Sequence, residues 1–215
     1  MSHPSCTLSN GSYLYRMPRA IGPHPYLSDL ADKMSSSSQS YIPSSRISLT
    51  RPSSWCHGAP GMLILLSTLL RRLPLSTTNS SPPETSISPA LHEKINASIT
   101  RAASLVYTRG FLRKGVGICH GVGGSVFALL AAANAQPANA EGHLSRAVHL
   151  AQLATQYRSL TRRRLMTGPD RPWSLYEGLA GMCCAWAEVV GRVRRGGVVL
   201  PGVGCGMPGF DDCGV

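Results

Sequence analysis

The stretch KGVGICHGVGGS, residues 114–125, places a cysteine beside a histidine and follows them with three glycines in four residues. A helical core has no need of such a pair, so the stretch indicates a site. Two other phrases share its plan, WCHGAPG at 55–61 and LYEGLAG at 175–181. In each phrase an apolar or aromatic residue precedes a polar pair and then Gly-x-x-Gly.

The first glycines of the three phrases, Gly58, Gly121 and Gly178, lie 63 and then 57 residues apart. A period near 60 residues indicates helical hairpins that stack to share a core. We expect the apolar helix after each phrase to lie in an inner ring, and the amphipathic helices to form an outer ring with one face to water. The glycines allow a sharp bend into the inner helix. The three phrases should therefore meet at one rim.

Hydrophobic periodicity predicts helices, and no segment alternates as a strand would, so the predicted fold class is all-α. The helices are expected at 61–73, 90–109, 123–134, 141–159 and about 175–191. Residues 76–89 are predicted to be a loop. Residues 1–54 are predicted to be a disordered leader, because 34–54 is rich in serine and has no hydrophobic period. The folded domain is then 55–215.

The composition narrows the class of protein. With 215 residues, 43% of them hydrophobic, the chain can form one domain with a core. The net charge of +11 arises mainly because acids are few, and no aromatic residues interleave with the short arginine clusters, which argues against nucleic-acid binding. A basic surface would still attract anionic small molecules or membrane surfaces.

The cysteines point to chemistry in a reducing compartment. There is no signal-peptide pattern, and the longest apolar stretch, 61–70, is too short to span a bilayer. We therefore predict a cytoplasmic protein whose seven cysteines are reduced, where metal binding or catalysis is favoured over disulfides. Cys183 and Cys184 are predicted to be core residues. Cys6, Cys205 and Cys213 show no partner pattern.

Cys56 occupies in the first phrase the position that Cys119 has in the second, and His120 follows Cys119. Two thiolates and one imidazole suit Zn²⁺, which takes such ligands tetrahedrally. Three protein ligands leave the fourth position open, as in catalytic zinc sites. A thiol bound there would be held as thiolate, although a free thiol has a pKa of roughly 8.5. Whether His57 adds a fourth ligand stays open.

Taken together, WCHGAPG, KGVGICHGVGGS and WSLYEGLAGM resemble, in order and spacing, the lanthionine synthetase C-like family, and GMPGFDD at 206–212 resembles its usual ending. The resemblance covers about residues 54–212. It implies an α/α toroid of seven helical hairpins with zinc at one rim, held by Cys56, Cys119 and His120. It also implies thioether formation. Bacterial members add a peptide cysteine to dehydroalanine or dehydrobutyrine, and eukaryotic-like members bind glutathione and add it to such residues in proteins.

The resemblance suggests further site residues. Lys114 matches a lysine that lies near glutathione in such members, where a cation could hold a carboxylate or stabilise the enolate; the alternative is a solvated lysine beside a turn. Thr167 stands where an arginine is expected, and Arg164 or Arg171 could replace that arginine. Glu177 could orient the rim by hydrogen bonding or cap the glycine turn.

A complete toroid needs roughly 400 residues at this period, and the chain carries only the last three motifs. An open arc would expose apolar flanks, each buried aliphatic side chain being worth ~1.5–3 kcal/mol when covered. We therefore expect impaired activity and a tendency to self-associate. Three functions stay open: a zinc-dependent enzyme that activates glutathione for addition to dehydrated residues, a non-catalytic zinc- or glutathione-binding or protein-interaction module, and an inactive fragment.

Overall fold

The computed structural model describes residues 55–73, 86–111, 113–196 and 206–210, and every regular element in these ranges is a helix. The predicted all-α fold class is confirmed. The elements are the 3₁₀ helix η1 (Trp55–His57), α2 (Ala59–Arg72), α3 (Pro89–Arg109), α4 (Val122–Ala135), the 3₁₀ helix η2 (Pro137–Asn139), α5 (Ala140–Ala154), α6 (Tyr157–Arg162) and α7 (Leu179–Arg194).

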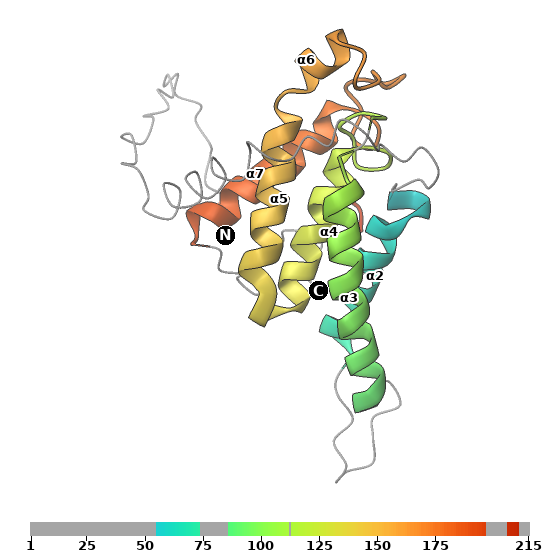
Figure 1. Ribbon diagram of the computed structural model, residues 1–215, viewed down its shortest axis with the longest axis vertical. Coiled ribbons are helices and arrows are strands. Elements are labelled where there is room, and N and C mark those ends of the chain that lie inside the picture. The colour runs from blue at the N-terminus through green and yellow to red at the C-terminus, as the bar shows by residue number, and fades with distance from the viewer. Residues whose placement is uncertain (1–54, 74–85, 112, 197–205, 211–215) are drawn as a thin grey trace, which may run out of the picture.

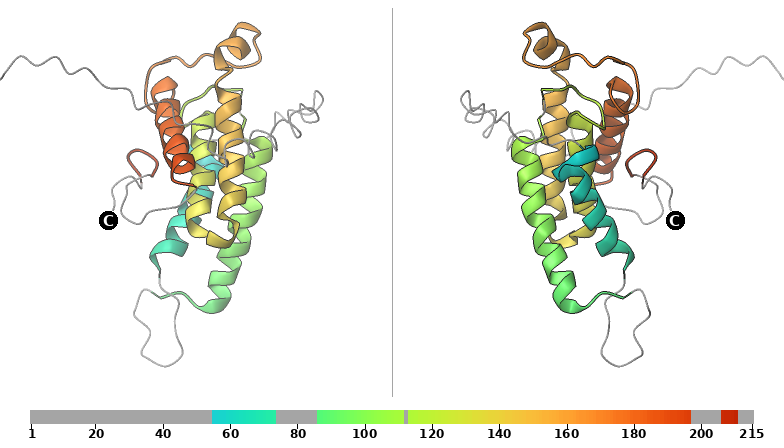
Figure 2. Two further views of the ribbon diagram at one scale, coloured as in Figure 1. Left: turned by 90° about the vertical axis from the view of Figure 1, so that its left-hand side faces the viewer. Right: turned by 90° about the vertical axis from the view of Figure 1, so that its right-hand side faces the viewer.

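The helices form a two-layered arc (Figures 1 and 2). Helices α2, α4 and α7 make the inner layer, in which α4 packs between the other two. Helices α3 and α5 make the outer layer, where α3 covers α2 and α4, and α5 covers α4 and α7. Two helical hairpins, α2–α3 and α4–α5, are thus followed by the inner helix of a third. This arrangement is the one expected of part of an α/α toroid.

Helix α4 is the centre of the core. Its residues 122–133 are all buried, because α2, α3, α5 and α7 surround it. The two other inner helices bury one face each. Met62 on α2 is 54% exposed and Val190 on α7 is 47% exposed. In the described part of the chain α2 and α7 each have an inner neighbour on one side only, so α4 shows the burial expected of an inner helix, and the exposed Met62 and Val190 agree with the expected apolar flanks of an open arc.

The outer helix α3 shows why this sequence forms a helix. Ser88 is the N-cap and accepts a hydrogen bond from the backbone N–H of Leu91 at 3.3 Å, and Pro89 occupies the first helical position. The buried residues then recur at helical spacing: Ile95, Ile99, Ala103 and Val106. The predicted helix 90–109 agrees with α3 to within one residue.

The prediction of a single helix over 141–159 is wrong, because α5 ends at Ala154 and α6 begins at Tyr157. The backbone N–H groups of Thr155 and Gln156 bond to carbonyls three residues back, at 3.1 Å each, and the Thr155 hydroxyl donates to the Gln152 carbonyl at 2.7 Å. This tighter turn interrupts the α-helical ladder. As a result α6 is set apart at one end of the molecule (Figure 1).

The helix expected at 175–191 begins later, at Leu179, because residues 175–178 form the third glycine turn. The predicted leader 1–54, most of the loop 76–89, and Cys6, Cys205 and Cys213 lie outside the described residues, so the leader stays a prediction. None of the described helices combines the length and apolarity needed to cross a membrane.

Candidate metal centre

The three sequence phrases fold into the same turn. The N-caps of α2, α4 and α7 are Gly58, Gly121 and Gly178, all in the extended backbone conformation. Three residues later comes a second glycine that no other residue can replace without a clash. A Cβ on Gly61, Gly124 or Gly181 would lie 2.1 Å from the carbonyl oxygen of the residue six positions earlier. The repeat read from the sequence is therefore a repeat of structure.

Backbone hydrogen bonds join the three turns. The N–H of Trp55 donates to the carbonyl of Cys119 at 3.0 Å, and the N–H of Cys119 donates to the carbonyl of Tyr176 at 2.7 Å. One residue of the second phrase thus contacts both the first and the third. The prediction that the phrases meet at one rim is confirmed.

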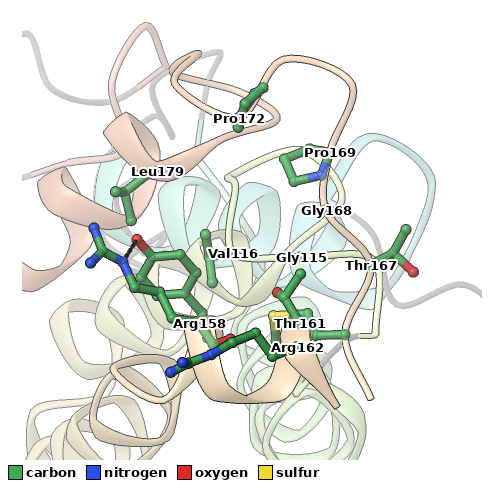
Figure 3. A pocket seen from close by; sticks show the side chains of 12 residues that line it. Gly115, Val116, Arg158, Thr161, Arg162, Thr167, Gly168, Pro169, Pro172 and Leu179 are labelled. Atoms are coloured by element: carbon green, nitrogen blue, oxygen red, sulfur yellow. Dashed lines mark hydrogen bonds between the residues drawn. The ribbon is translucent and has the colours of Figure 1, made fainter. Parts of the chain in front are cut away.

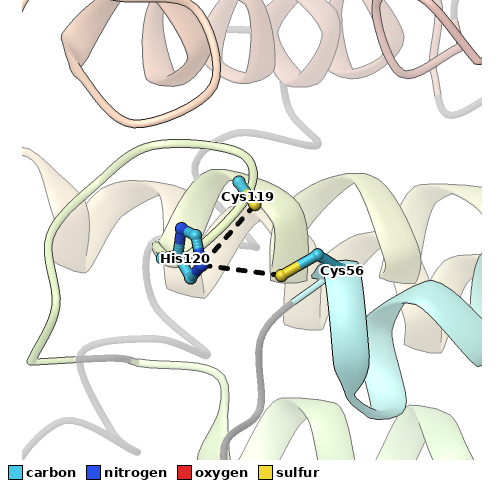
Figure 4. Close-up of side chains that lie close together, drawn as sticks. All are labelled: Cys56, Cys119 and His120. Carbon is cyan, nitrogen blue, oxygen red and sulfur yellow. Dashed lines mark hydrogen bonds between the residues drawn. The ribbon is translucent and has the colours of Figure 1, made fainter. Parts of the chain in front are cut away.

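This rim brings together the three predicted metal ligands (Figure 4). The Sγ of Cys56 lies 3.5 Å from Nε2 of His120, and the Sγ of Cys119 lies 3.7 Å from the same nitrogen. All three ligand atoms lie within 4.8 Å of one another, so the group could hold a metal ion. With Zn–S near 2.3 Å and Zn–N near 2.0–2.1 Å, a tetrahedral site has sulfur–nitrogen edges of about 3.6 Å. The spacing therefore fits Zn²⁺.

The electrostatics of the cluster also favour a cation. Burial raises the pKa of the Cys119 thiol to about 11, with the neighbouring Cys56 as the next cause and the Glu177 carboxylate as a smaller one. Near neutral pH this thiol is protonated unless a positive charge compensates the thiolate. A bound divalent cation would reverse the balance, because a coordinated thiol loses its proton. Cys56 is exposed, whereas Cys119 and His120 are half-buried.

Lys114 lies in the loop between α3 and α4 and is exposed to solvent. The backbone N–H of Thr167 donates to the carbonyl of Arg113 at 2.6 Å, and an Arg113 guanidinium nitrogen lies 3.4 Å from the Arg164 carbonyl. The loop before the third phrase therefore packs beside the turn that carries Lys114. Arg164 and Arg171 are both exposed there. The structure does not choose between Arg164 and Arg171 as the residue that takes the place of the expected arginine.

Glu177 is exposed, and its backbone N–H, not its carboxylate, takes part in the local turn by donating to Oγ of Ser174 at 3.2 Å. Its charge raises the pKa of the Cys119 thiol.

Cys183 is exposed, so its prediction as a core residue is wrong; among the described helices α7 lies at the edge of the inner layer and turns this position outward. Cys184 is half-buried and packs against the core. The side chain of His57 lies outside what the structure describes.

Comparison with known proteins agrees with this geometry. The family model for lanthionine synthetase C-like protein matches residues 23–192. The chain belongs to the lanthionine synthetase C-like family. The matched region includes all three residues of the metal cluster. It begins ahead of Trp55, inside the segment predicted to be a leader.

A curated relative, glutathione S-transferase LANCL1 from Danio rerio, is 27% identical to the chain over 140 residues. The match covers 65% of this chain and 29% of the relative. The match thus spans less than a third of the relative's length, so similarity alone does not assign the whole relative's activity to this chain.

A concave surface beside this rim, which α6 forms with the loop that follows it, did not follow from the sequence. The short arginine cluster Arg162–Arg164 does not by itself indicate a pocket. The pocket depends on the helix break at Thr155, which sets α6 apart from α5 and which the hydrophobic pattern does not reveal.

Proposed function

We propose that the chain binds Zn²⁺ through Cys56, Cys119 and His120, and that it activates the thiol of glutathione for addition to dehydroalanine or dehydrobutyrine residues of a protein or peptide. The observation that carries the proposal is the meeting of three soft ligand atoms, from two hairpins, within 4.8 Å. Two sulfurs and one nitrogen favour Zn²⁺ over oxygen-seeking Ca²⁺ or Mg²⁺. Family membership supports the same reaction class.

Zinc bound there would act as a Lewis acid that keeps a thiol ionised at neutral pH. In the addition, the thiolate sulfur forms a bond to the β-carbon of the dehydrated residue. The alkene electron pair moves into the adjacent carbonyl as an enolate, and a proton is then delivered to the α-carbon. The balance is one thiol plus one alkene giving one thioether.

The chain's own residues would orient these partners. Cys56 is exposed, so the cluster is reachable from solvent. Lys114, on the turn that leads into the second phrase, would hold a glutathione carboxylate or stabilise the enolate oxygen. Because such chemistry needs reduced thiols, we propose that the protein acts in the cytoplasm.

A second candidate function is a binding module without catalysis. In the part of the chain that the structure describes, no carboxylate and no further histidine joins the three-residue cluster. The cluster by itself therefore provides ligands for a metal but no separate acid to protonate the enolate.

Two measurements test these functions. Metal analysis of the purified chain should find one zinc per molecule, lost in Cys119→Ala and retained in Cys183→Ala, which removes an exposed thiol on α7. Mass spectrometry of a dehydroalanine peptide incubated with glutathione should show the adduct only with the zinc-loaded protein. Zinc without an adduct selects the binding module. A metal-free wild-type protein contradicts both functions.

A further inference from the structure

A pocket of about 480 Å³ lies between α6, the loop that follows it and the start of the second phrase (Figure 3). A volume in this range is typical of ligand sites. Its apolar walls come from separate parts of the chain, among them Val116, Met166, Pro172 and Leu179. None of Cys56, Cys119 and His120 lines it, so the pocket is distinct from the metal cluster.

One side of the pocket is positively charged. Arg158 and Arg162, one turn apart on α6, line it together with Thr161, and no carboxylate does. Arg158 is held in place by the Tyr157 ring: its Nε donates to the phenol oxygen at 3.1 Å, and its guanidinium carbon lies 5.9 Å from the ring centroid. Within the described residues neither arginine takes part in a salt bridge. The pocket thus pairs an apolar wall with two cations that have no acidic partner in the described part of the chain.

The pocket lies close to the candidate metal centre. Val116, on its wall, is three residues from Cys119, and three residues of extended chain span at most about 11 Å. A peptide advances about 3.3 Å per residue when extended. A chain whose reactive residue sits at the metal centre would therefore reach the pocket with a neighbour no more than three or four residues away.

We propose that this pocket binds an acidic side chain and an adjoining apolar side chain of the substrate peptide, within three or four residues of the dehydrated residue. The inference rests on the proposed function and adds a substrate preference to it. Arg158 and Arg162 pair with the carboxylate, and the apolar wall receives the neighbouring side chain. Trp173, which follows the lining residue Pro172 in the chain, is 72% exposed and offers a further apolar side chain to a bound peptide.

Two other anionic ligands are less well matched to this shape. Arg158 and Arg162 are themselves exposed, but Val116 and Met166 on the pocket wall are almost fully buried and lie beyond the reach of a flat membrane surface. Glutathione, γ-glutamyl-cysteinyl-glycine, offers carboxylates for the two arginines but has no apolar side chain to fill the wall formed by Val116, Met166, Pro172 and Leu179.

The test is fluorescence anisotropy with zinc-loaded full-length chain and labelled peptides. The peptides carry serine in place of the dehydrated residue, so that no reaction occurs. One has Glu-Leu at the third and fourth positions after the serine, and its matched control has Gln-Ser. We expect the Glu-Leu peptide to bind about tenfold more tightly, with the difference shrinking as salt is raised.

Arginine variants identify the surface. Arg158→Gln and Arg162→Gln should each weaken binding of the Glu-Leu peptide about fivefold or more, and Arg163→Gln, which removes the same charge outside the pocket lining, should not. Equal affinity for the two peptides overturns the proposal. So does an equal loss in all three variants, since that would be a general effect of net charge.

Competition experiments show which anionic ligand occupies the pocket: the peptide, glutathione or an acidic lipid. Displacement of the peptide by glutathione assigns the pocket to the thiol substrate and overturns the proposal, as does displacement by vesicles containing phosphatidylserine but not by neutral vesicles. Different results would contradict the proposed function and the pocket proposal. If glutathione adducts form on a short dehydroalanine peptide while the Glu-Leu peptide does not bind, only the pocket proposal is wrong. If the peptide binds with the expected arginine dependence but no zinc is found, only the proposed function is wrong.

Discussion

The backbone N–H of Trp55 donates to the carbonyl oxygen of Cys119 at 3.0 Å. Because Cys56 follows Trp55 directly, this bond fixes the backbone of one candidate ligand against the backbone of another. The hydrogen bond itself involves no side chain and no metal. The spacing of the two sulfurs is thus a property of the helical arc, so the proposed zinc site is preorganised by the fold.

Zinc binding should stabilise the folded chain, since its ligands come together only when the two hairpins are packed. With free zinc a thousandfold above its dissociation constant, the free energy of unfolding should rise by about 4 kcal/mol. Thermal unfolding with and without a chelator measures the effect. Cys119→Ala should abolish it and Cys183→Ala should preserve it. An equal zinc response in both variants would show that the metal binds elsewhere.

Substitution of Lys114 tests whether this lysine takes part in the reaction or is only a solvated surface residue. Lys114→Gln should lower the rate of glutathione addition about tenfold or more, because a cation near the developing negative charge is lost. Zinc content should stay unchanged. Lys94→Gln, which removes an exposed lysine from α3, is the matched control. If the two variants react at the same rate, Lys114 is only a surface residue beside the turn.

The second glycine of each phrase should tolerate no side chain. In Gly124→Ala the new Cβ would lie 2.1 Å from the Ile118 carbonyl oxygen, and the buried backbone cannot move aside. We expect a loss of about 3 kcal/mol or more in urea unfolding. Gly142→Ala, on α5, meets no atom within 4 Å and should gain up to about 1 kcal/mol. A mild effect of Gly124→Ala would mean that the turn is not built as described.

Arg192 ties α7 to the centre of the core. It is 3% exposed, donates to Oε1 of Glu188 at 2.5 Å, and reaches Oδ1 of Asn134 on α4 at 2.6 Å. Arg192→Leu should destabilise the chain by about 3–5 kcal/mol in urea unfolding, because it leaves the half-buried Glu188 carboxylate without its cation. Arg194→Leu, an exposed position on the same helix, should change the stability by less than about 1 kcal/mol. Similar losses in both variants would contradict a specific role for Arg192.

His143 should make the chain sensitive to acid. Burial lowers the pKa of this imidazole, with the charge of Arg146 as the second cause, and its Nε2 lies 2.8 Å from Oε1 of Gln136. The unfolded chain, with a histidine pKa near 6.5, then takes up the proton first as the pH falls. This contribution to stability is complete above about pH 6.5 and is lost below it, by up to about 1.4 kcal/mol per pH unit.

The measurement is the urea midpoint of wild type and His143→Gln at pH 7.5 and pH 5.5. Acidification should lower the midpoint of the wild type more than that of the variant, because the variant has no proton to take up at this position. An identical decrease in the two proteins would assign the acid sensitivity to other groups.

Local sequence patterns predicted helix bounds well where the capping residues and the apolar stripe mark the same segment. The bounds of α3 follow from Ser88, Pro89 and a regular apolar stripe, all of which are local in the sequence. The break between α5 and α6 did not follow, because the competing three-residue hydrogen bonds of Thr155 and Gln156 leave no mark in hydrophobic periodicity. The exposure of Cys183 did not follow either, since burial at an edge helix depends on which neighbours are present.

The amino-acid sequence by itself determined the all-α class, the three glycine turns and the residues of the candidate metal centre, because each depends on residue types and spacings that repeat along the chain. Only the tertiary structure decided that Cys56 lies 3.5 Å from His120 and that α6 turns two arginines toward a pocket beside them. Both relationships depend on how separate hairpins pack, and packing is set by contacts between residues far apart in the sequence.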